Sequence, residues 1–347
     1  MLIVLVLVHE LGHFFTAKAM KVRVEEFGLF YPPRLWGFKY GETLYSINAI
    51  PIGGFCKMAG EEDPKVPGSL AGKSRKARAL ILSAGAIMNL ILPLVLLSIA
   101  FMVPHTEVTA PSLVASVSPG SPAQQAGILA GDTILSINNH TVTSPNDLSR
   151  YVQINLGSKV TMVVQHADGT PQTVSLVPRW NPPAGQGAIG VEWNVDAITA
   201  QQVVSTKSYP FWRAIPLGFN DCIQTFILFK NGIVGIIIGT APATFLGPVG
   251  VAQLTGEIAK AGISPLLEFA AAFSINLGIL NLFPLPALDG GHIFFVFLEW
   301  VRRGKRVSPK TENMVHLIGF ALLLALIVFF TYGDIARIIG GGSVLPN

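Results

Sequence analysis

Charged residues are scarce in this sequence. Asp, Glu, Lys and Arg make up 13% of its 347 residues, against about 25% in average soluble proteins. Half of the residues are hydrophobic, and the mean hydropathy is +0.53. This composition excludes an ordinary soluble enzyme and predicts an integral membrane protein. The net charge of +4 is mild, and its basic residues gather beside apolar runs, so we expect no nucleic-acid partner.

Cysteine is also scarce, and the first apolar run does not have the pattern of a cleavable leader. Cys56 and Cys222 lie far apart in unlike contexts, which argues against a disulfide framework and a cysteine-based zinc site. The first apolar run is followed by Lys18 and Lys21 and has no small-residue cleavage site. We therefore expect no cleavable signal peptide.

Long apolar runs predict about four membrane spans, at 1–17, 79–103, 269–288 and 314–332. The first run is short, with eight residues before His9, whereas a helix needs about 20 residues to cross the bilayer. Either the segment around His9 lies near mid-depth of a barely sufficient helix, or the start of the sequence is shortened.

Basic residues predict the topology. Segment 18–78 holds eleven Lys/Arg and six Asp/Glu, and segment 302–310 holds five Lys/Arg. Both should be cytoplasmic, so an even number of crossings separates them. Segment 231–256 is uncharged but would make the number odd. We therefore expect 209–256 to be interfacial. Six residues of this segment would break a single spanning helix, namely Gly235, Gly239, Pro242, Gly247, Pro248 and Gly250. The aromatic residues expected to face the lipid are Phe211, Trp212, Phe219, Phe226 and Phe229.

Two segments have the alternating pattern of strands. Residues 43–50 alternate, 51–55 are typical of a turn, and the pattern resumes at Cys56, which predicts a membrane-associated β-hairpin over 43–58. This hairpin is either a plain connector or an edge strand that pairs with an extended peptide. A β-rich module follows at 107–180, in which we expect His105, His140 and His166 to be solvated.

The first apolar run contains His9-Glu10-Leu11-Gly12-His13. On a helix, positions i and i+4 share one face, so His9 and His13 can hold one zinc ion while Glu10 takes a proton from a metal-bound water. Ionisable residues in a bilayer segment are costly and are usually functional. The alternative is a buried helix that happens to carry two histidines.

A carboxylate directly after the third apolar run is expected to complete this site. Pro284 and Pro286 remove backbone donors and open the helix just before Asp289. A lone carboxylate in apolar surroundings needs a cation, and no Lys or Arg lies nearby, so Asp289 is the expected third zinc ligand. His292 is the competing ligand. Two histidines and a carboxylate leave the fourth zinc position for water, as in hydrolases.

Gly85 and Asn89 lie four residues apart on one face of the second span. Gly85 allows close helix contact, and the amide of Asn89 either hydrogen-bonds within the bundle or faces the site.

Together these motifs resemble the site-2 protease family of intramembrane zinc metalloproteases, of the regulator-of-sigma-E protease (RseP) type. The resemblance covers nearly the whole chain. Residues 119–138 are similar to a bacterial PDZ domain. One PDZ module is found here where the best-known member has two. The motifs that carry the resemblance are His9-Glu10-Leu11-Gly12-His13-Phe14, Gly53-Gly54-Phe55, Gly247-Pro248-Val249-Gly250 and Asn281-x-x-Pro284-x-Pro286-x-Leu288-Asp289-Gly290.

The resemblance implies a membrane α-helical bundle with a cytoplasmic-side β-hairpin and an inserted PDZ domain outside the cytoplasm, in the bacterial inner membrane. Its domains would be 1–106, 107–180, 181–263 and 264–347. Glu10 would be the general base, and His9, His13 and Asp289 would bind one Zn²⁺. The candidate substrate-binding residues are Asn281, Pro284, Pro286, Gly53, Gly54, Phe55 and Asn89.

Substrates of the family are single-span membrane proteins, such as anti-sigma factors. The PDZ domain either contacts the C-termini of these substrates by strand addition or filters substrates sterically. Two rival functions are a zinc-dependent membrane transporter and a catalytically inactive PDZ adaptor. A transporter needs a polar path, for which only Asn89, Glu268, Asn276, Asn281 and His316 are available. An adaptor has no need of Glu10.

Overall fold

The computed structural model describes residues 1–61, 63–241 and 246–340, and of residues 51, 52 and 197 it describes only the backbone. Pro242, one of the predicted helix breakers, lies outside the described residues. The chain divides into two compact units. One comprises Met1–Ala100, Trp212–Cys222 and Phe245–Asn347, and the other comprises Phe101–Phe211 and Ile223–Thr244.

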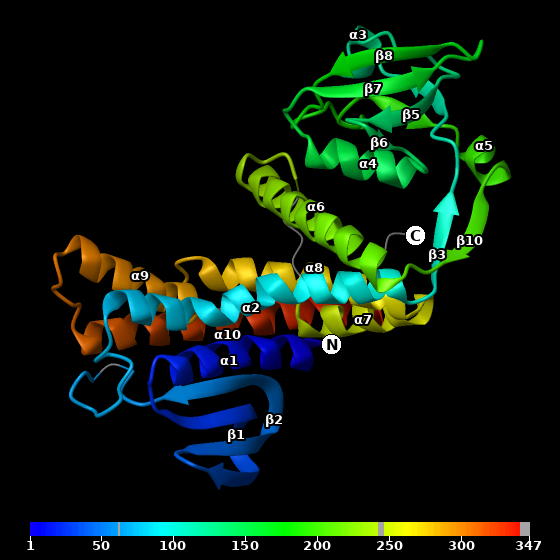
Figure 1. Cartoon of the computed structure of the whole chain (residues 1–347). Coiled ribbons are helices and arrows are strands. Elements are labelled where there is room, and N and C mark those ends of the chain that lie inside the picture. The colour runs from blue at the N-terminus through cyan, green and yellow to red at the C-terminus, as the bar shows by residue number, and fades with distance from the viewer. Residues whose placement is uncertain (62, 242–245, 341–347) are drawn as a thin grey trace. The chain divides into compact units, whose positions relative to one another are not determined.

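The first unit is a helical bundle. Among the described residues, four helices are long and apolar enough to span a membrane, as the sequence predicts. They are α1 (Leu2–Ala19), α2 (Arg75–Met102), α8 (Ile263–Leu282) and α10 (Pro309–Ile339). Two shorter helices, α7 (Pro248–Ala261) and α9 (Asp289–Val301), belong to the same unit (Figure 1).

Glycines let helices of the bundle approach closely. A Cβ on Gly12 of α1 would lie 2.5 Å from the carbonyl oxygen of Ala84 on α2, and one on Gly278 of α8 would lie 3.0 Å from that of Ala86. Small residues at such crossings allow backbone-to-backbone packing that larger side chains would prevent. Helix α2 therefore lies against both α1 and α8.

Buried polar pairs also join elements of the bundle. Arg78 of α2 donates to Glu299 of α9 at 2.6 Å, and both side chains are about nine-tenths buried. At the start of α7, the Gly250 N–H donates to the carboxylate of Asp334 on α10 at 2.6 Å. A Cβ on Gly250 would lie 2.6 Å from an oxygen of that carboxylate, which explains a glycine at this point of the Gly247-Pro248-Val249-Gly250 motif.

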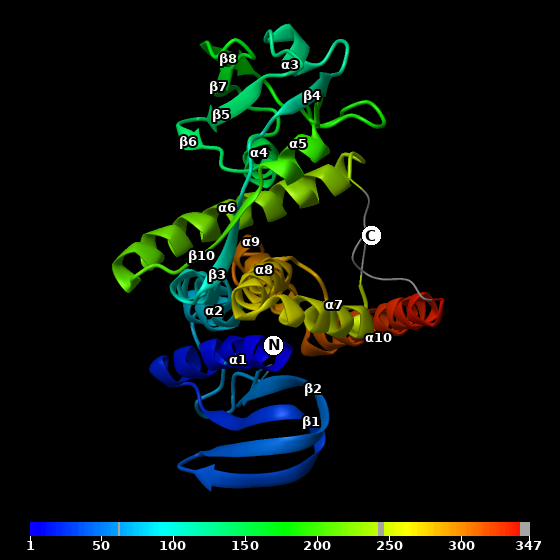
Figure 2. The ribbon, with the colours of Figure 1, turned by 90° about the vertical axis from the view of Figure 1, so that its right-hand side faces the viewer.

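Two long bent strands, β1 (Val24–Tyr40) and β2 (Thr43–Met58), form the sheet of this unit, which packs against α1 (Figures 1 and 2). The predicted turn at 51–55 is wrong, because the chain reverses between the two strands and β2 continues through that segment. The bend of β2 lets both of its halves flank the first half of β1. Leu29 pairs with Ile47 on one side and with Gly54 on the other. Residues 54–58 therefore form an edge of the sheet.

The second unit contains the β-rich module. Its four-stranded sheet has the order β6-β5-β7-β8, and β4 pairs with β9 while β3 pairs with β10. The buried core includes Val114, Met162 and Ile189, so the module extends beyond the expected boundary at residue 180. The bounds are β3 His105–Thr109, β4 Val114–Val117, α3 Pro122–Gln125, β5 Thr133–Ile137, β6 His140–Thr141, α4 Pro145–Ile154, β7 Val160–Gln165, β8 Pro171–Leu176, β9 Val191–Trp193, α5 Val195–Ala200 and β10 Val203–Lys207.

Helix α6 (Phe211–Ile237) precedes α7 and is not among the candidate spans. It ends before Gly239, and α7 begins at Pro248, so segment 231–256 is not one helix, as predicted. Within the second unit, Asn231 of α6 donates to the carbonyl oxygens of Gln153 and Ile154 at 2.8 and 3.1 Å. The last carbonyl groups of a helix have no N–H donor within that helix. Asn231 therefore supplies the hydrogen bonds that these two carbonyls at the C-terminal end of α4 lack.

Candidate metal centre

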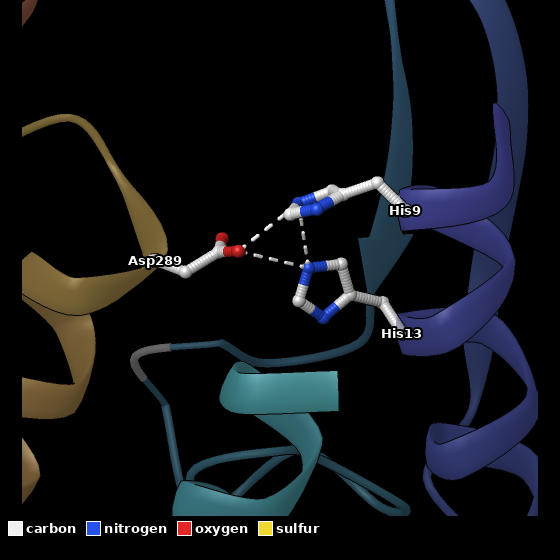
Figure 3. Close-up of side chains that lie close together, drawn as sticks. All are labelled: His9, His13 and Asp289. Atoms are coloured by element: carbon white, nitrogen blue, oxygen red, sulfur yellow. Dashed lines mark hydrogen bonds and ion pairs between the residues drawn. The ribbon is translucent and has the colours of Figure 1, made fainter. Parts of the chain in front are cut away.

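Three ligand atoms from two distant parts of the chain meet inside the bundle. The Nε2 atoms of His9 and His13 lie 3.2 Å apart on one face of α1, and an Oδ2 atom of Asp289 lies 3.0 Å from the first and 3.2 Å from the second (Figure 3). A tetrahedral zinc site with bonds of about 2.0–2.1 Å has ligand atoms about 3.3 Å apart. The three atoms therefore fit one zinc ion and leave its fourth position free.

Helix α2 supports the two histidines. Nδ1 of His13 lies 2.8 Å from the carbonyl oxygen of Ile81. A carbonyl can only accept, so this contact places the His13 proton on Nδ1 and leaves the Nε2 lone pair for a metal. A Cβ on Gly85 would lie 2.7 Å from Nε2 of His9 and closer still to Nε2 of His13. The sequence predicts a helix-packing role for Gly85, but in the structure this residue keeps the space around the ligand atoms clear.

Asp289 is held by a break between two helices. Helix α8 ends at Leu282, six residues before the expected end of this apolar run, and α9 begins at Asp289. Ala287 has a φ of +73°, a backbone conformation that costs a non-glycine residue about 1–3 kcal/mol. Its N–H donates to Nδ1 of His316 on α10 at 3.1 Å. No local sequence pattern indicates this role of His316.

The glycine pair after Asp289 lets the break fold back on itself. A Cβ on Gly290 would clash with the carbonyl group of Phe283, and one on Gly291 would lie 2.6 Å from the carbonyl oxygen of Leu285. The segment after α8 therefore runs directly over the first turn of α9. This close approach requires residues without side chains.

Glu10 lines the same cavity as the three ligand residues, which has a volume of about 350 Å³. The edge segment of β2 forms another wall of this cavity, through Gly54 and Phe55. A Cβ on Gly54 would lie 3.4 Å from Cγ of Glu10, so the edge strand passes directly over the acidic side chain. The site thus combines a metal triad, a carboxylate and an edge strand.

The expected substrate-binding residues take different positions. Asn281 is buried and lines the cavity. Pro284 and Pro286 are exposed and do not line the cavity, and Pro286 packs against Gly319. Gly53 lies beside Tyr31. Asn89 is fully buried behind His9, which places it outside the cavity rather than facing a substrate.

Two further groups near the site have other roles. The ring of His292 stacks on that of His316 with centroids 3.8 Å apart, so Asp289 and not His292 joins the two histidines of α1. Cys56 also lines the cavity. Burial, followed by the Glu10 charge, raises the pKa of its thiol well above the ordinary value. A neutral thiol is a weak nucleophile, so Cys56 does not suit covalent catalysis.

Comparison with known proteins decides the class of this site. Residues 1–326 match the family described as Peptidase family M50. The chain belongs to the M50 peptidases, the family of site-2 proteases. A Clostridium acetobutylicum relative that carries a zinc metalloprotease name is 39% identical over 96% of this chain and 94% of its own. Zinc metalloprotease RasP of Oceanobacillus iheyensis is 29% identical over 96% of this chain and 97% of its own.

This M50 peptidase is therefore a metalloprotease whose cofactor is zinc, as the sequence predicts, and four of its described helices are apolar enough to span a membrane. One solved structure, the PDZ domain of an SdrC-like protein from Listeria monocytogenes, is 21% identical and covers 25% of this chain and 90% of that chain, with a TM-score of 0.22.

Proposed function

We propose that this M50 peptidase hydrolyses peptide bonds within or near the transmembrane segments of single-span membrane proteins, such as anti-sigma factors, in regulated intramembrane proteolysis. The observation that carries the proposal is the position of the metal triad. His9 and His13 lie on a helix that is apolar enough to span a membrane, and both are more than nine-tenths buried. A metal centre built into such a helix suits a substrate that is itself in the bilayer.

In this proposal His9, His13 and Asp289 hold the zinc ion. When bound, zinc supplies Lewis-acid chemistry, lowering the pKa of a bound water and polarising a carbonyl group. Asp289 neutralises part of the charge of the ion, and the Ile81 carbonyl keeps His13 in the ligating tautomer.

Glu10 acts as the general base. It lies one residue after His9 on α1 and shares the cavity with Asp289. Its carboxylate accepts a proton from the attacking water and then donates it to the leaving amine, which is the exchange that peptide hydrolysis requires. Asn281 lines this cavity, so its side-chain amide can donate to the substrate carbonyl oxygen.

The edge segment of β2, including Gly54 and Phe55, holds the substrate extended. A peptide bond inside a helix is shielded by the hydrogen bonds of the helix, so the substrate must unwind before attack. Residues 54–58 pair with β1 on one side only. The other side offers backbone groups to which an unwound peptide can add as a strand.

The chain lies in the bacterial inner membrane, and its β-rich module acts as a PDZ domain outside the cytoplasm. Its helix-turn-strand segment over 122–137 follows the predicted PDZ pattern, with Gly127 at φ +83° after α3. Such a domain either binds the C-terminus of a trimmed substrate or filters substrates by size.

The test uses Glu10→Gln in the full-length chain, reconstituted with a single-span reporter. Glutamine cannot accept the proton, so we expect cleavage to fall by about 10²–10⁴-fold while zinc content stays at the wild-type level. Asp289→Ala is the companion variant, and we expect it to lose zinc together with cleavage.

Cleavage by Glu10→Gln at the wild-type rate would remove Glu10 from the mechanism. Wild-type protein that binds zinc but leaves every single-span reporter intact, and instead moves zinc across the vesicle membrane, would favour the transporter function.

A further inference from the structure

Asn89 of α2 lies directly behind His9 and away from the cavity. Its amide nitrogen is 3.3 Å from Nδ1 of His9, and the residue has no exposed surface. Its amide oxygen is buried and has no hydrogen-bond partner in the described part of the chain. A buried polar atom without a partner costs about 1–3 kcal/mol, so this arrangement needs a reason.

The backbone of Asn89 is fixed at this place. Ser274 of α8 donates to the Asn89 carbonyl oxygen at 2.8 Å, and both side chains are fully buried. This bond joins α2 to α8 at the level of His9. The amide therefore cannot move away from the imidazole, but it can turn about its last bond.

The two orientations of the amide have opposite consequences for His9. With the nitrogen toward Nδ1, the amide donates and the His9 proton must sit on Nε2, where it blocks a metal. A half-turn brings the amide oxygen to the same position. The oxygen accepts a proton from Nδ1 and leaves the Nε2 lone pair free for the ion.

We propose that Asn89 is a positioning residue that holds His9 in its metal-ligating tautomer through its amide oxygen. The proposal rests on the assignment of His9 as a zinc ligand under the proposed function. Asn89 would then do for His9 what the Ile81 carbonyl does for His13. Helix α2 would supply the acceptor behind each histidine of α1.

The experiment measures zinc rather than cleavage. The full-length wild type, Asn89→Leu and Asn89→Asp are purified in detergent, stripped of metal, and titrated with zinc in competition with a chelator of known affinity. Leucine has a similar size but no acceptor, so we expect zinc affinity about 10–100-fold below wild type. Aspartate keeps an acceptor and has no N–H to leave unpaired, so we expect affinity within about threefold of wild type or higher.

Ser98→Ala is the matched control. Ser98 is a buried polar residue of the same helix whose hydroxyl donates to the Leu94 carbonyl oxygen within α2. We expect zinc affinity to be unchanged in this variant. The visible absorption of bound Co²⁺ gives a second readout, because it reports the ligand geometry and should change in Asn89→Leu alone.

Three results would overturn the proposal. They are wild-type zinc affinity in Asn89→Leu, a loss of affinity in Asn89→Asp as large as that in Asn89→Leu, and an equal loss in Ser98→Ala. Failure of the proposed function would look different. Full zinc binding by Asp289→Ala would remove Asp289 from the ligand set, and wild-type cleavage by Glu10→Gln would remove Glu10 from the chemistry. Neither result resembles the zinc affinities expected for the Asn89 variants.

Discussion

The two halves of the metal centre are built in opposite ways. His9 and His13 come from an uninterrupted helix, and their spacing alone brings both to one face. Asp289 comes from the first position of α9, after a six-residue interruption in which Ala287 has a positive φ. One half is regular and needs only close packing, while the other is irregular and needs specific support.

This difference decides where each half is vulnerable. The regular half depends on the absence of atoms, because Gly85 must leave the space beside both Nε2 atoms empty. The irregular half depends on contacts that are present, chiefly the bond from the Ala287 N–H to His316. Adding a methyl group should therefore break the first half, and removing a hydrogen bond should loosen the second.

The largest effect is expected at Gly85. In Gly85→Ala the new methyl group would lie 2.7 Å from Nε2 of His9 and closer to that of His13, in the space that the ligand atoms need. We expect zinc binding and cleavage to be lost, as measured by zinc content after dialysis at a fixed free zinc concentration. Full zinc content in this variant would show that the histidines ligate from another position.

Gly278→Ala is the matched control for this variant. Its methyl group would also be forced against α2, at 3.0 Å from the Ala86 carbonyl oxygen, but away from the ligand atoms. We expect a lower melting temperature with zinc still bound. Equal loss of zinc in both variants would mean that helix spacing in general, and not the space at Gly85, governs the metal site.

The regular half could be predicted from the sequence, and the irregular half only in part. The helix period places His9, Glu10 and His13 together, and the cost of an isolated carboxylate indicates Asp289. The support of Ala287 by His316 could not be predicted, because the partners are 29 residues apart and alanine gives no sign of a positive φ. Sequence patterns report local periods, whereas this support depends on tertiary contacts.

The sheet shows the same limit. Gly53-Gly54 is typical of a turn, yet β2 bends there, with Gly53 at φ +70°, and keeps its pairing with β1. The module boundary at 180 was missed because β9 spans only Val191–Trp193. A strand of three residues is too short to show an alternating pattern.

An intermediate effect is expected at His316. In His316→Leu the Ala287 N–H loses its acceptor, and an unsatisfied donor costs about 1–3 kcal/mol. The segment before Asp289 should relax, so we expect zinc affinity to fall about tenfold as the carboxylate becomes less well positioned, measured by chelator competition. His292→Leu removes the stacked neighbour but leaves the Ala287 bond intact, and it should change affinity much less. A larger loss of zinc affinity in His292→Leu than in His316→Leu would show that His316 does not support the site.

The smallest effects are expected from substitutions to glycine, one in each half of the metal centre. The two substitutions should change stability in opposite directions. Ala287 has φ +73°, which glycine adopts without strain, so Ala287→Gly should raise stability slightly, by up to about 1 kcal/mol. Ala17 lies buried in the regular helix α1, where glycine costs at least about 0.5–1 kcal/mol in helix propensity. Ala17→Gly should therefore lower stability. Melting temperatures of the two variants at saturating zinc, compared with wild type, provide the measurement. If both variants melted lower by the same amount, residue 287 would be unstrained. The irregular half would then not differ from the regular half in backbone strain.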